Sequence, residues 1–318
     1  MSVDLALSVE VMREAVRRVD PDLVIAPMLT TAIPADIWSA RPCFVIHPGP
    51  RGDRGPSSLD WAIMDGAERW GVTVLQANAE MDAGDIWASA EFTVRRCSKS
   101  SLYRTEVTDA ALDALLLAVA RFEGGRYRPE PLDYSRADVT GRLRGPCRQE
   151  HRRIDWSSEQ TSSVLAKLRA ADSRPGVLDM MGGTAYFLYG GHEEDHLRGD
   201  PGTIVARRGG AICRATTDGA VWIPQLRRRP ATGGPATFKM PATLALGEAA
   251  AAVPEVDAPL VVPPGRRTYQ EISYRESDGV GYLEFSFPGG AMSTDQCRQL
   301  LGVLDLHSSP PGRPAARG

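Results

Sequence analysis

An imidazole and a carboxylate each stand at a glycine-containing turn between residues 47 and 85. His47 ends an apolar run and precedes Pro48-Gly49, and Asp82 lies in the segment Met81-Asp82-Ala83-Gly84-Asp85. An imidazole gains and loses a proton near neutral pH, and a neighbouring carboxylate can orient or relay that proton. The pattern therefore predicts a proton-transfer site at strand ends, with His47 and Asp82 as its catalytic residues.

The same stretch resembles the formyltransferases that use 10-formyltetrahydrofolate, in which an Asn-x-His-Pro segment faces an aspartate in a later Leu-Asp-x-Gly-Asp loop. His47 and Asp82 fall on the two catalytic positions, whereas Val45 occupies the asparagine position. Within that superfamily the amino-acid sequence is most similar to that of the HypX/HoxX hydrogenase maturation factors, and the resemblance extends to about Leu301. It rests on the blocks Ile46-His47-Pro48-Gly49-Pro50, Gly52-Asp53-Arg54-Gly55-Pro56-Ser57-Ser58-Leu59-Asp60-Trp61-Ala62-Ile63, Val72-Thr73-Val74-Leu75-Gln76-Ala77-Asn78 and Lys99-Ser100-Ser101-Leu102-Tyr103-Arg104.

The resemblance implies 10-formyltetrahydrofolate as the one-carbon donor and coenzyme A as the acceptor, with formyl-coenzyme A as the product. In the whole family member a crotonase-type half would then release carbon monoxide for the iron of [NiFe] hydrogenase, so that the hydrogenase maturation machinery is an expected partner. Arg51 and Arg54 either bind the folate glutamate or a coenzyme A phosphate, or are solvated loop arginines. The expected cofactor-binding residues are Pro48, Gly49, Arg51, Gly52, Arg54, Gly55, Ser57, Ser58, Gln76, Gly84 and Asp85.

Val45 removes the amide that this family directs at the oxyanion of the reaction. Loss of such a donor costs about 2.7 to 4 kcal/mol of transition-state stabilisation. A backbone N–H, Ser57, Ser58 or Gln76 is a candidate replacement, and an ionised thiol acceptor would need less help. Two alternative functions stay open: a methionyl-tRNA or sugar-amine formyltransferase, and a folate-binding fragment without turnover.

Composition limits the class of protein. The net charge of −3 gives no general attraction to nucleic acid, and no apolar run approaches the roughly 20 residues of a membrane span. Five cysteines lie far apart without paired spacing, and no apolar N-terminal segment resembles a secretory signal. We therefore expect a cytoplasmic protein with reduced thiols that binds neither nucleic acid nor membrane and carries no metal.

The first 120 residues alternate short apolar runs with helical patterns, as in a parallel α/β sheet. Strands are predicted over 3–7, 23–26, 43–46 and 71–76, and helices after Ser8, after Pro56 and over 101–122. The fold class expected is a doubly wound formyltransferase sheet. By the resemblance, the strand, glycine turn and helix that open such a domain, about 30 residues, are expected to be missing.

The second half of the chain predicts a helix over 159–171 and short strands over 184–188, 202–206, 211–215 and 220–223, with a hairpin at Asp218-Gly219. This resembles the small β-barrel, OB-like domain of transfer-RNA formyltransferases. The expected division is 1–128 catalytic domain (incomplete at its N-terminus), 129–148 linker, 149–248 β-barrel-like domain, 249–268 linker, 269–304 start of a crotonase-like domain, and 305–318 disordered tail.

His192-Glu193-Glu194-Asp195-His196 satisfies the zinc-protease pattern His-Glu-x-x-His. That pattern binds zinc when a helix places both histidines on one face. Gly190-Gly191 precedes it and Gly199-Asp200-Pro201-Gly202 follows it, which leaves no room for such a helix. We therefore predict a surface loop without metal.

Overall fold

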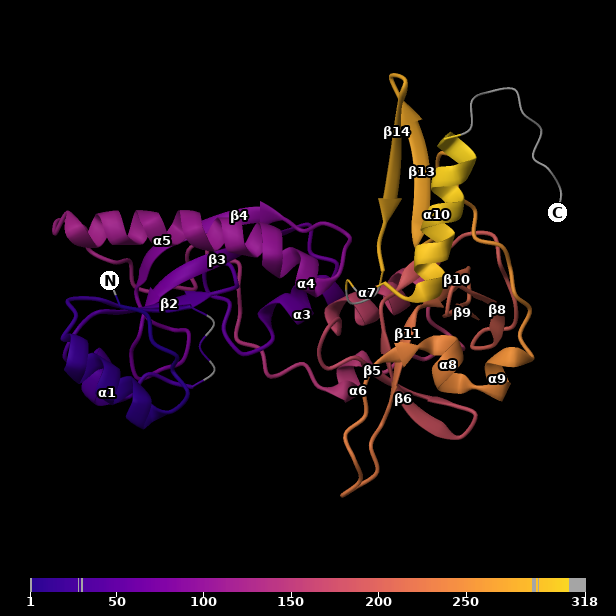
Figure 1. Ribbon diagram of the computed structural model, residues 1–318. Coiled ribbons are helices and arrows are strands. Elements are labelled where there is room, and N and C mark those ends of the chain that lie inside the picture. Colours follow the sequence, from indigo (N-terminus) through magenta and orange to yellow (C-terminus); the bar gives the residue numbers. More distant parts are fainter. Residues whose placement is uncertain (1, 28, 30, 288–289, 291, 309–318) are drawn as a thin grey trace. The chain divides into compact units, whose positions relative to one another are not determined.

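The computed structural model describes residues 2–27, 29, 31–287, 290 and 292–308. The chain forms two compact units (Figure 1). The first comprises residues 1–154 and 166–179, and the second comprises residues 155–165 and 180–318. The tail predicted to be disordered falls, from residue 309 onward, outside the described residues.

A four-stranded sheet organises the first unit, in the order β1 (Val24–Pro27), β2 (Cys43–His47), β3 (Arg69–Gln76) and β4 (Ile86–Thr93). Only β1 and β2 are parallel, since β2 with β3 and β3 with β4 pair antiparallel. The expected parallel sheet was therefore wrong beyond its first pair. A short connection from β3 to β4 returns the chain directly, and such a connection makes an antiparallel pair.

Helices cover both faces of this sheet, as expected of a doubly wound fold. On one face α1 (Val9–Val19) and α2 (Ala35–Trp38) bring Met12 and Ile37 against Cys43 of β2. On the other face α5 (Thr108–Glu123) runs along β3 and β4 (Figure 1). The alanines of α5 let the helix approach the sheet closely, and this second cluster consists of Phe44, Val74, Trp87, Ala88, Ala114 and Ala118.

Local signals fixed several of these elements. The Ser8 hydroxyl accepts a hydrogen bond from the Val11 N–H at the start of α1, and Asp20 ends that helix in the left-handed conformation. α3 (Ser58–Met64) follows Pro56 as predicted. The helix predicted over 101–122 is built from α4 (Lys99–Leu102), a π-helical turn η1 (Tyr103–Val107) and α5.

The strand predicted over residues 3–7 is wrong. This segment has no strand pairing, and Val3, Leu5 and Leu7 are 77–82% exposed. Among the described residues of the first unit, no strand lies beside it to take up its backbone hydrogen bonds. An alternating apolar pattern forms a strand only where a partner strand and a buried face are present.

The second unit contains short antiparallel strands in two four-stranded sheets, ordered β7-β10-β9-β8 and β12-β11-β6-β5. The Asp218-Gly219 hairpin joins β9 to β10 as predicted. The helix predicted over 159–171 is α7. α6 (Gln149–Arg152) belongs to the first unit, whereas α7 (Thr161–Ala170) and β5 (Val177–Met181) have residues in both units. The bounds of the other elements are β6 (Thr184–Tyr189), β7 (His192–Glu194), β8 (Ile204–Arg208), β9 (Ala211–Ala215), β10 (Ala220–Ile223), β11 (Gln225–Arg228), β12 (Met240–Pro241), α8 (Ala242–Leu246) and α9 (Glu248–Ala251).

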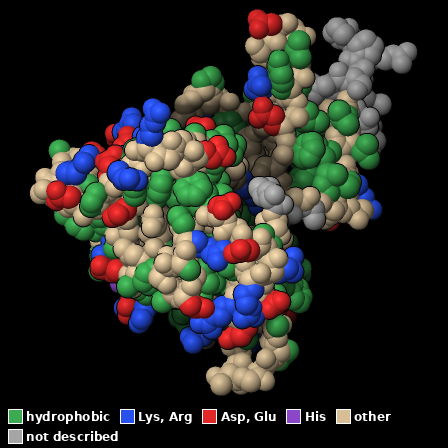
Figure 2. Space-filling model, turned by 90° about the vertical axis from the view of Figure 1, so that its left-hand side faces the viewer, with side chains coloured by type: hydrophobic (Ala, Val, Ile, Leu, Met, Phe, Trp, Pro, Cys, Tyr) green, Lys and Arg blue, Asp and Glu red, His purple; other side chains and the backbone are tan. Residues whose placement is uncertain are grey.

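The C-terminal part of the described chain is a hairpin followed by a helix: β13 (Ile272–Ser277), β14 (Val280–Phe285) and α10 (Thr294–Ser308). No helix in the described ranges is long and apolar enough to cross a membrane. Charged side chains of both signs are interspersed with apolar ones on the face shown in Figure 2.

The His-Glu-x-x-His pattern does not lie on a helix. His192 begins β7, and Glu194, the last residue of that strand, is buried with its carboxylate accepting hydrogen bonds from Trp222 Nε1 at 2.8 Å and from the backbone N–H of His196 at 2.9 Å. No group of three or more His, Cys, Asp or Glu side chains that could hold a metal occurs among the described residues. The predicted surface loop is therefore wrong for residues 192–194, which form β7, and the buried Glu194 serves the packing of the second unit.

A buried ion cluster in the first unit anchors the segment that follows residue 129. Asp60 on α3 accepts hydrogen bonds from Lys99 Nζ, at 3.0 Å to both oxygens, and from Arg152 of α6. Asp60 and Arg152 are both buried. Removing one member of a buried ion cluster leaves the others uncompensated, which is strongly destabilising.

We therefore expect Asp60→Asn to lower the free energy of unfolding of the first unit by about 3 kcal/mol. Urea denaturation followed by circular dichroism measures this change. Asp109→Asn, an exposed position on α5, is the matched control. A change within about 0.5 kcal/mol of wild type would show that the cluster contributes little.

Candidate active site

His47 is the last residue of β2, and the pleat of the strand decides where its ring points. Phe44 and Ile46 pack against the cores on the α5 side of the sheet. Because successive side chains of a strand point to opposite faces, Val45 and His47 lie on the other face. The imidazole is 4% exposed, so that its nitrogens need protein partners.

Two carboxylates supply those partners, one at each ring nitrogen. His47 Nε2 lies 2.8 Å from Asp53 Oδ2, a hydrogen-bond distance. His47 Nδ1 lies 3.6 Å from Asp82 Oδ1, which is an ion-pair distance and too long for a hydrogen bond. The structure thus brings together the two predicted catalytic residues and adds a third, Asp53, which is 2% exposed.

Several contacts fix the loop that carries Asp82. Asp82 has a positive φ of 53°, a conformation that aspartate tolerates better than most residues, and its Oδ2 accepts a hydrogen bond from the Gly55 N–H at 3.1 Å. Arg54 holds the same loop, since its Nε donates to the Met81 carbonyl and its Nη2 to Glu80 Oε1 at 2.6 Å. Asp82 is therefore positioned from the loop that also carries Asp53.

Residues 129–148, predicted to be a linker, pack along the loop of residues 51–55. Tyr134 Oη donates to the Gly52 carbonyl, the Gly141 N–H donates to the Arg51 carbonyl, and backbone hydrogen bonds join Arg54 to Arg142 and Arg144. A Cβ on Gly141 would lie 1.9 Å from the Asp53 nitrogen, so that this contact requires glycine. The segment therefore forms one wall of the site.

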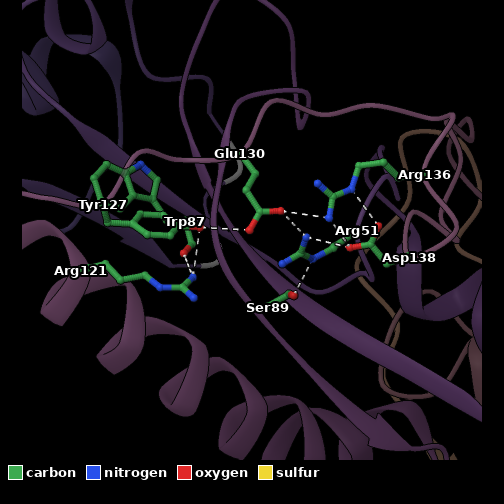
Figure 3. Close-up of polar contacts among 8 residues, drawn as sticks. All are labelled: Arg51, Trp87, Ser89, Arg121, Tyr127, Glu130, Arg136 and Asp138. Atoms are coloured by element: carbon green, nitrogen blue, oxygen red, sulfur yellow. Dashed lines mark hydrogen bonds and ion pairs between the residues drawn. The ribbon is translucent and has the colours of Figure 1, made fainter.

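Arg51 is occupied by acidic partners within the first unit (Figure 3). Its guanidinium donates to Ser89 Oγ at 2.9 Å, to Glu130 Oε2 at 2.8 Å and to Asp138 Oδ2 at 3.0 Å. Arg136 pairs with the same two carboxylates. Hydrogen bonding and charge from Arg51 lower the pKa of Glu130, although burial of that carboxyl opposes the shift. Arg51 is therefore neither a solvated loop arginine nor an unpaired anion-binding group, because its guanidinium already has three partners within the unit.

Most other residues predicted to bind the cofactor have internal partners. Ser58 Oγ donates to the Pro48 carbonyl at 2.7 Å, and Ser57 Oγ accepts from the Cys147 N–H. Gly52 and Gly55 have positive φ, a Cβ on Gly84 would lie 1.7 Å from the Gln76 carbonyl oxygen, and Asp85 is exposed. The conformation of the loops is therefore sufficient to account for the types of these residues, and the contacts do not by themselves indicate a ligand.

Gln76 is placed away from the position that Val45 occupies. In the β2–β3 register Gln76 is opposite Phe44, and its Oε1 accepts a hydrogen bond from Trp87 Nε1 of the α5-side core. Directly opposed residues of an antiparallel pair point to the same face. The Gln76 amide therefore lies on the face opposite to Val45 and His47 and cannot directly replace an asparagine at position 45.

The thiols of the first unit's core are not nucleophiles near neutral pH. Burial raises the pKa of Cys43, on β2, to about 11. Burial also raises the pKa of Cys147, with Arg152 as an opposing influence. Only the thiolate form of cysteine attacks an electrophile, so that these residues do not suggest a covalent enzyme intermediate. The candidate reactive groups of the site are therefore the imidazole and its carboxylates.

Asp53 is the site residue that was not singled out from the sequence. It stands six residues after His47, within Gly52-Asp53-Arg54-Gly55. A carboxylate between two glycines in a loop that follows a histidine at a strand end is an available signal. The signal is not specific, because aspartate beside glycine is also the usual composition of a turn.

Two family models match the chain. One described as "Formyl transferase" matches residues 6–119, and one described as "Formyl transferase, C-terminal domain" matches residues 146–235. Both the catalytic half and the following domain of these enzymes are thus represented in the chain.

Individual relatives give a narrower result. The chain is 46% identical over 313 residues to the hydrogenase maturation factor HoxX of Bradyrhizobium diazoefficiens, a match that covers 98% of this chain and 53% of that protein. The crystal structure of HypX from Aquifex aeolicus in complex with tetrahydrofolic acid is 40% identical, with a TM-score of 0.89 over 98% of this chain and 53% of that one. The methionyl-tRNA formyltransferase of Thermotoga maritima is 28% identical over 214 residues, 65% of this chain and 66% of that enzyme.

The matches to HoxX and HypX each cover 98% of the chain, whereas the match to the methionyl-tRNA formyltransferase covers 65% of it. The chain spans about half the length of the HoxX and HypX proteins that it matches. It belongs to the formyltransferase family, in the group formed by the HypX and HoxX proteins.

Proposed function

We propose that this chain transfers a formyl group from 10-formyltetrahydrofolate to the thiol of coenzyme A, giving formyl-coenzyme A. The observation that carries the proposal is the buried His47, whose two ring nitrogens each face a carboxylate, in a chain similar to a HypX structure solved with tetrahydrofolic acid. The site offers an imidazole to move a proton and carboxylates to hold the resulting charge. An imidazole between two carboxylates fits an acyl transfer in which a proton is removed from the nucleophile and a proton is delivered to the leaving nitrogen.

His47 Nδ1 is the nitrogen available for that proton. Bound 10-formyltetrahydrofolate would supply the formyl carbon. Nδ1 takes the thiol proton as the carbon–sulfur bond forms, and returns it to the folate nitrogen as the carbon–nitrogen bond breaks, so that the enzyme ends each turnover unchanged. Asp82, 3.6 Å from Nδ1, stabilises the imidazolium in between.

The two arginines of the predicted binding set have a positioning role in this proposal. Arg51 and Arg54 each already pair with acidic side chains, and they order the loops around Asp53 and Asp82. Val45 offers no amide to the oxyanion. We propose that the imidazolium formed when Nδ1 takes the thiol proton supplies part of that stabilisation. The sulfur, once it has lost its proton, needs less activation than an amine.

The wider role follows from the relatives. We infer that the product serves hydrogenase maturation, because the HoxX relative carries that name and matches 98% of this chain. In this proposal residues 269–304, which contain β13, β14 and most of α10, open a crotonase-type domain. That domain would release carbon monoxide from formyl-coenzyme A for the iron of [NiFe] hydrogenase.

Incubating the protein with 10-formyltetrahydrofolate and coenzyme A should give formyl-coenzyme A, detected by mass spectrometry. His47→Gln should lower kcat at least about 100-fold, because the proton-transfer group is lost. Methionyl-tRNA and a sugar amine serve as competing acceptors. Formylation of either of these, with none of coenzyme A, would contradict the proposed acceptor.

Gly49→Ala tests whether the close packing around His47 matters for transfer. A Cβ at this position would lie 2.3 Å from Asp53 Oδ2 and 2.7 Å from His47 Nε2, so that the pair must separate. We expect kcat for formyl transfer to fall about 10-fold or more. Gly145→Ala is the matched control, because a Cβ there meets no atom within 4 Å and the backbone is not in the left-handed region. Equal activity of the two variants would refute the effect.

A further inference from the structure

We propose that Asp53 is a positioning residue for the reaction: by accepting the Nε2–H of His47, it fixes the ring and its tautomer, and leaves Nδ1 as the working nitrogen. This inference rests on the proposed formyl transfer for its catalytic meaning. The pairing itself stands on geometry, since His47 Nε2 and Asp53 Oδ2 lie 2.8 Å apart and both residues are buried.

The environment of Asp53 points to this single purpose. In the described part of the chain, His47 is the one group that hydrogen-bonds the Asp53 carboxylate, in contrast to Asp60, which binds both Lys99 and Arg152. Burying a carboxylate without a partner costs several kcal/mol. Because His47 is the one side chain of the described residues that hydrogen-bonds the Asp53 carboxylate, this contact must offset most of that cost.

Two glycines make room for Asp53, one four residues before it and one 88 residues after it in the sequence. A Cβ on Gly49 would lie 2.3 Å from Asp53 Oδ2, and a Cβ on Gly141 would lie 1.9 Å from the Asp53 nitrogen. Any other residue at either position would displace the aspartate. The segment of residues 129–148 thus contributes to catalysis indirectly, by holding Asp53 against the ring.

Tautomer control follows from the hydrogen-bonding capacity of imidazole. A neutral ring has one N–H donor and one acceptor nitrogen. A carboxylate acceptor at Nε2 requires the proton on that atom, so that Nδ1 carries the lone pair on the side of Asp82. When Nδ1 takes up a proton, the new N–H points toward Asp82 and the ring is a cation between two anions. Flipping the ring would place carbon atoms against both carboxylates, which disfavours that orientation.

Nitrogen-15 NMR of the imidazole rings tests the proposal without any substrate. The chain has five histidines, and the His47→Gln variant assigns the His47 signals by their absence. At a pH where the ring is neutral, we expect wild-type His47 to be protonated at Nε2 and unprotonated at Nδ1. Asp53→Ala should give a mixture of the two tautomers. Wild-type protein with the proton on Nδ1, or Asp53→Ala with the Nε2–H form unchanged, would overturn the proposal.

Kinetics of formyl-coenzyme A formation give the second readout. We expect Asp53→Asn, which keeps the shape without the charge, to lower kcat about 10- to 100-fold, part of the 10²- to 10⁴-fold that general acid–base catalysis contributes. KM for 10-formyltetrahydrofolate should stay within about twofold, since Asp53 is proposed to act through His47 rather than on the substrate. Asp109→Asn on α5 is the matched control.

The two readouts separate the two hypotheses. Absence of formyl transfer by wild-type protein, with the Nε2–H tautomer present and lost in Asp53→Ala, refutes the proposed function and upholds the pairing. Active wild-type protein with an unchanged kcat in Asp53→Asn refutes the positioning role alone. If Asp53→Ala fails to fold, the ring tautomer is measured in Asp53→Leu instead, because leucine also offers no acceptor to Nε2–H. A spectrum identical to that of wild type in that variant counts against the proposal.

Discussion

The contact between His47 Nε2 and the buried carboxylate of Asp53 is the constraint on which the site depends. An aspartate excluded from water must be paired, and here the partner is the ring at the end of β2. The geometry on the other side of the ring follows, because one nitrogen is already engaged and only Nδ1 can face Asp82. The loops of residues 51–55 and 81–85 are therefore organised around one imidazole.

Ionic contacts around the loops of the site stabilise that arrangement. Arg54 links the loop of residues 51–55 to the loop that carries Asp82. Arg51 links the loop of residues 51–55 to Glu130 and Asp138. Asp60 anchors the far end of the segment through Arg152. A surface ion pair contributes little stability by itself, but several that share one loop limit its alternatives. Arg51 and Arg54, for which the sequence suggested ligand binding, thus restrict the conformations of the site loops.

Much of the fold and part of the site could be predicted from the sequence. Ser8 as a helix cap, the apolar run that ends at His47 and the Asp218-Gly219 turn are local signals, and each gave the observed element. The pairing of Asp53 with His47 was not predicted, because it depends on a loop conformation that Gly141 stabilises from 88 positions away in the sequence. The strand expected over residues 3–7 failed for a similar reason, since pairing is not a property of the segment alone.

The pleat of β2 decides which side chains can reach the reacting groups, and position 45 is the example. Val45 shares a face with His47, so that an asparagine there would point an amide into the same space, whereas Gln76 lies on the other face of the sheet. Gln76, the amide side chain paired in register with β2, therefore does not replace the missing one. What the site has in addition is a second carboxylate on the imidazole. In the proposed reaction, the ring becomes a cation between Asp53 and Asp82 once Nδ1 takes up the thiol proton, and it then carries positive charge where an amide would have offered only a dipole. Loss of the asparagine is thus compatible with transfer to an acceptor as nucleophilic as a thiolate.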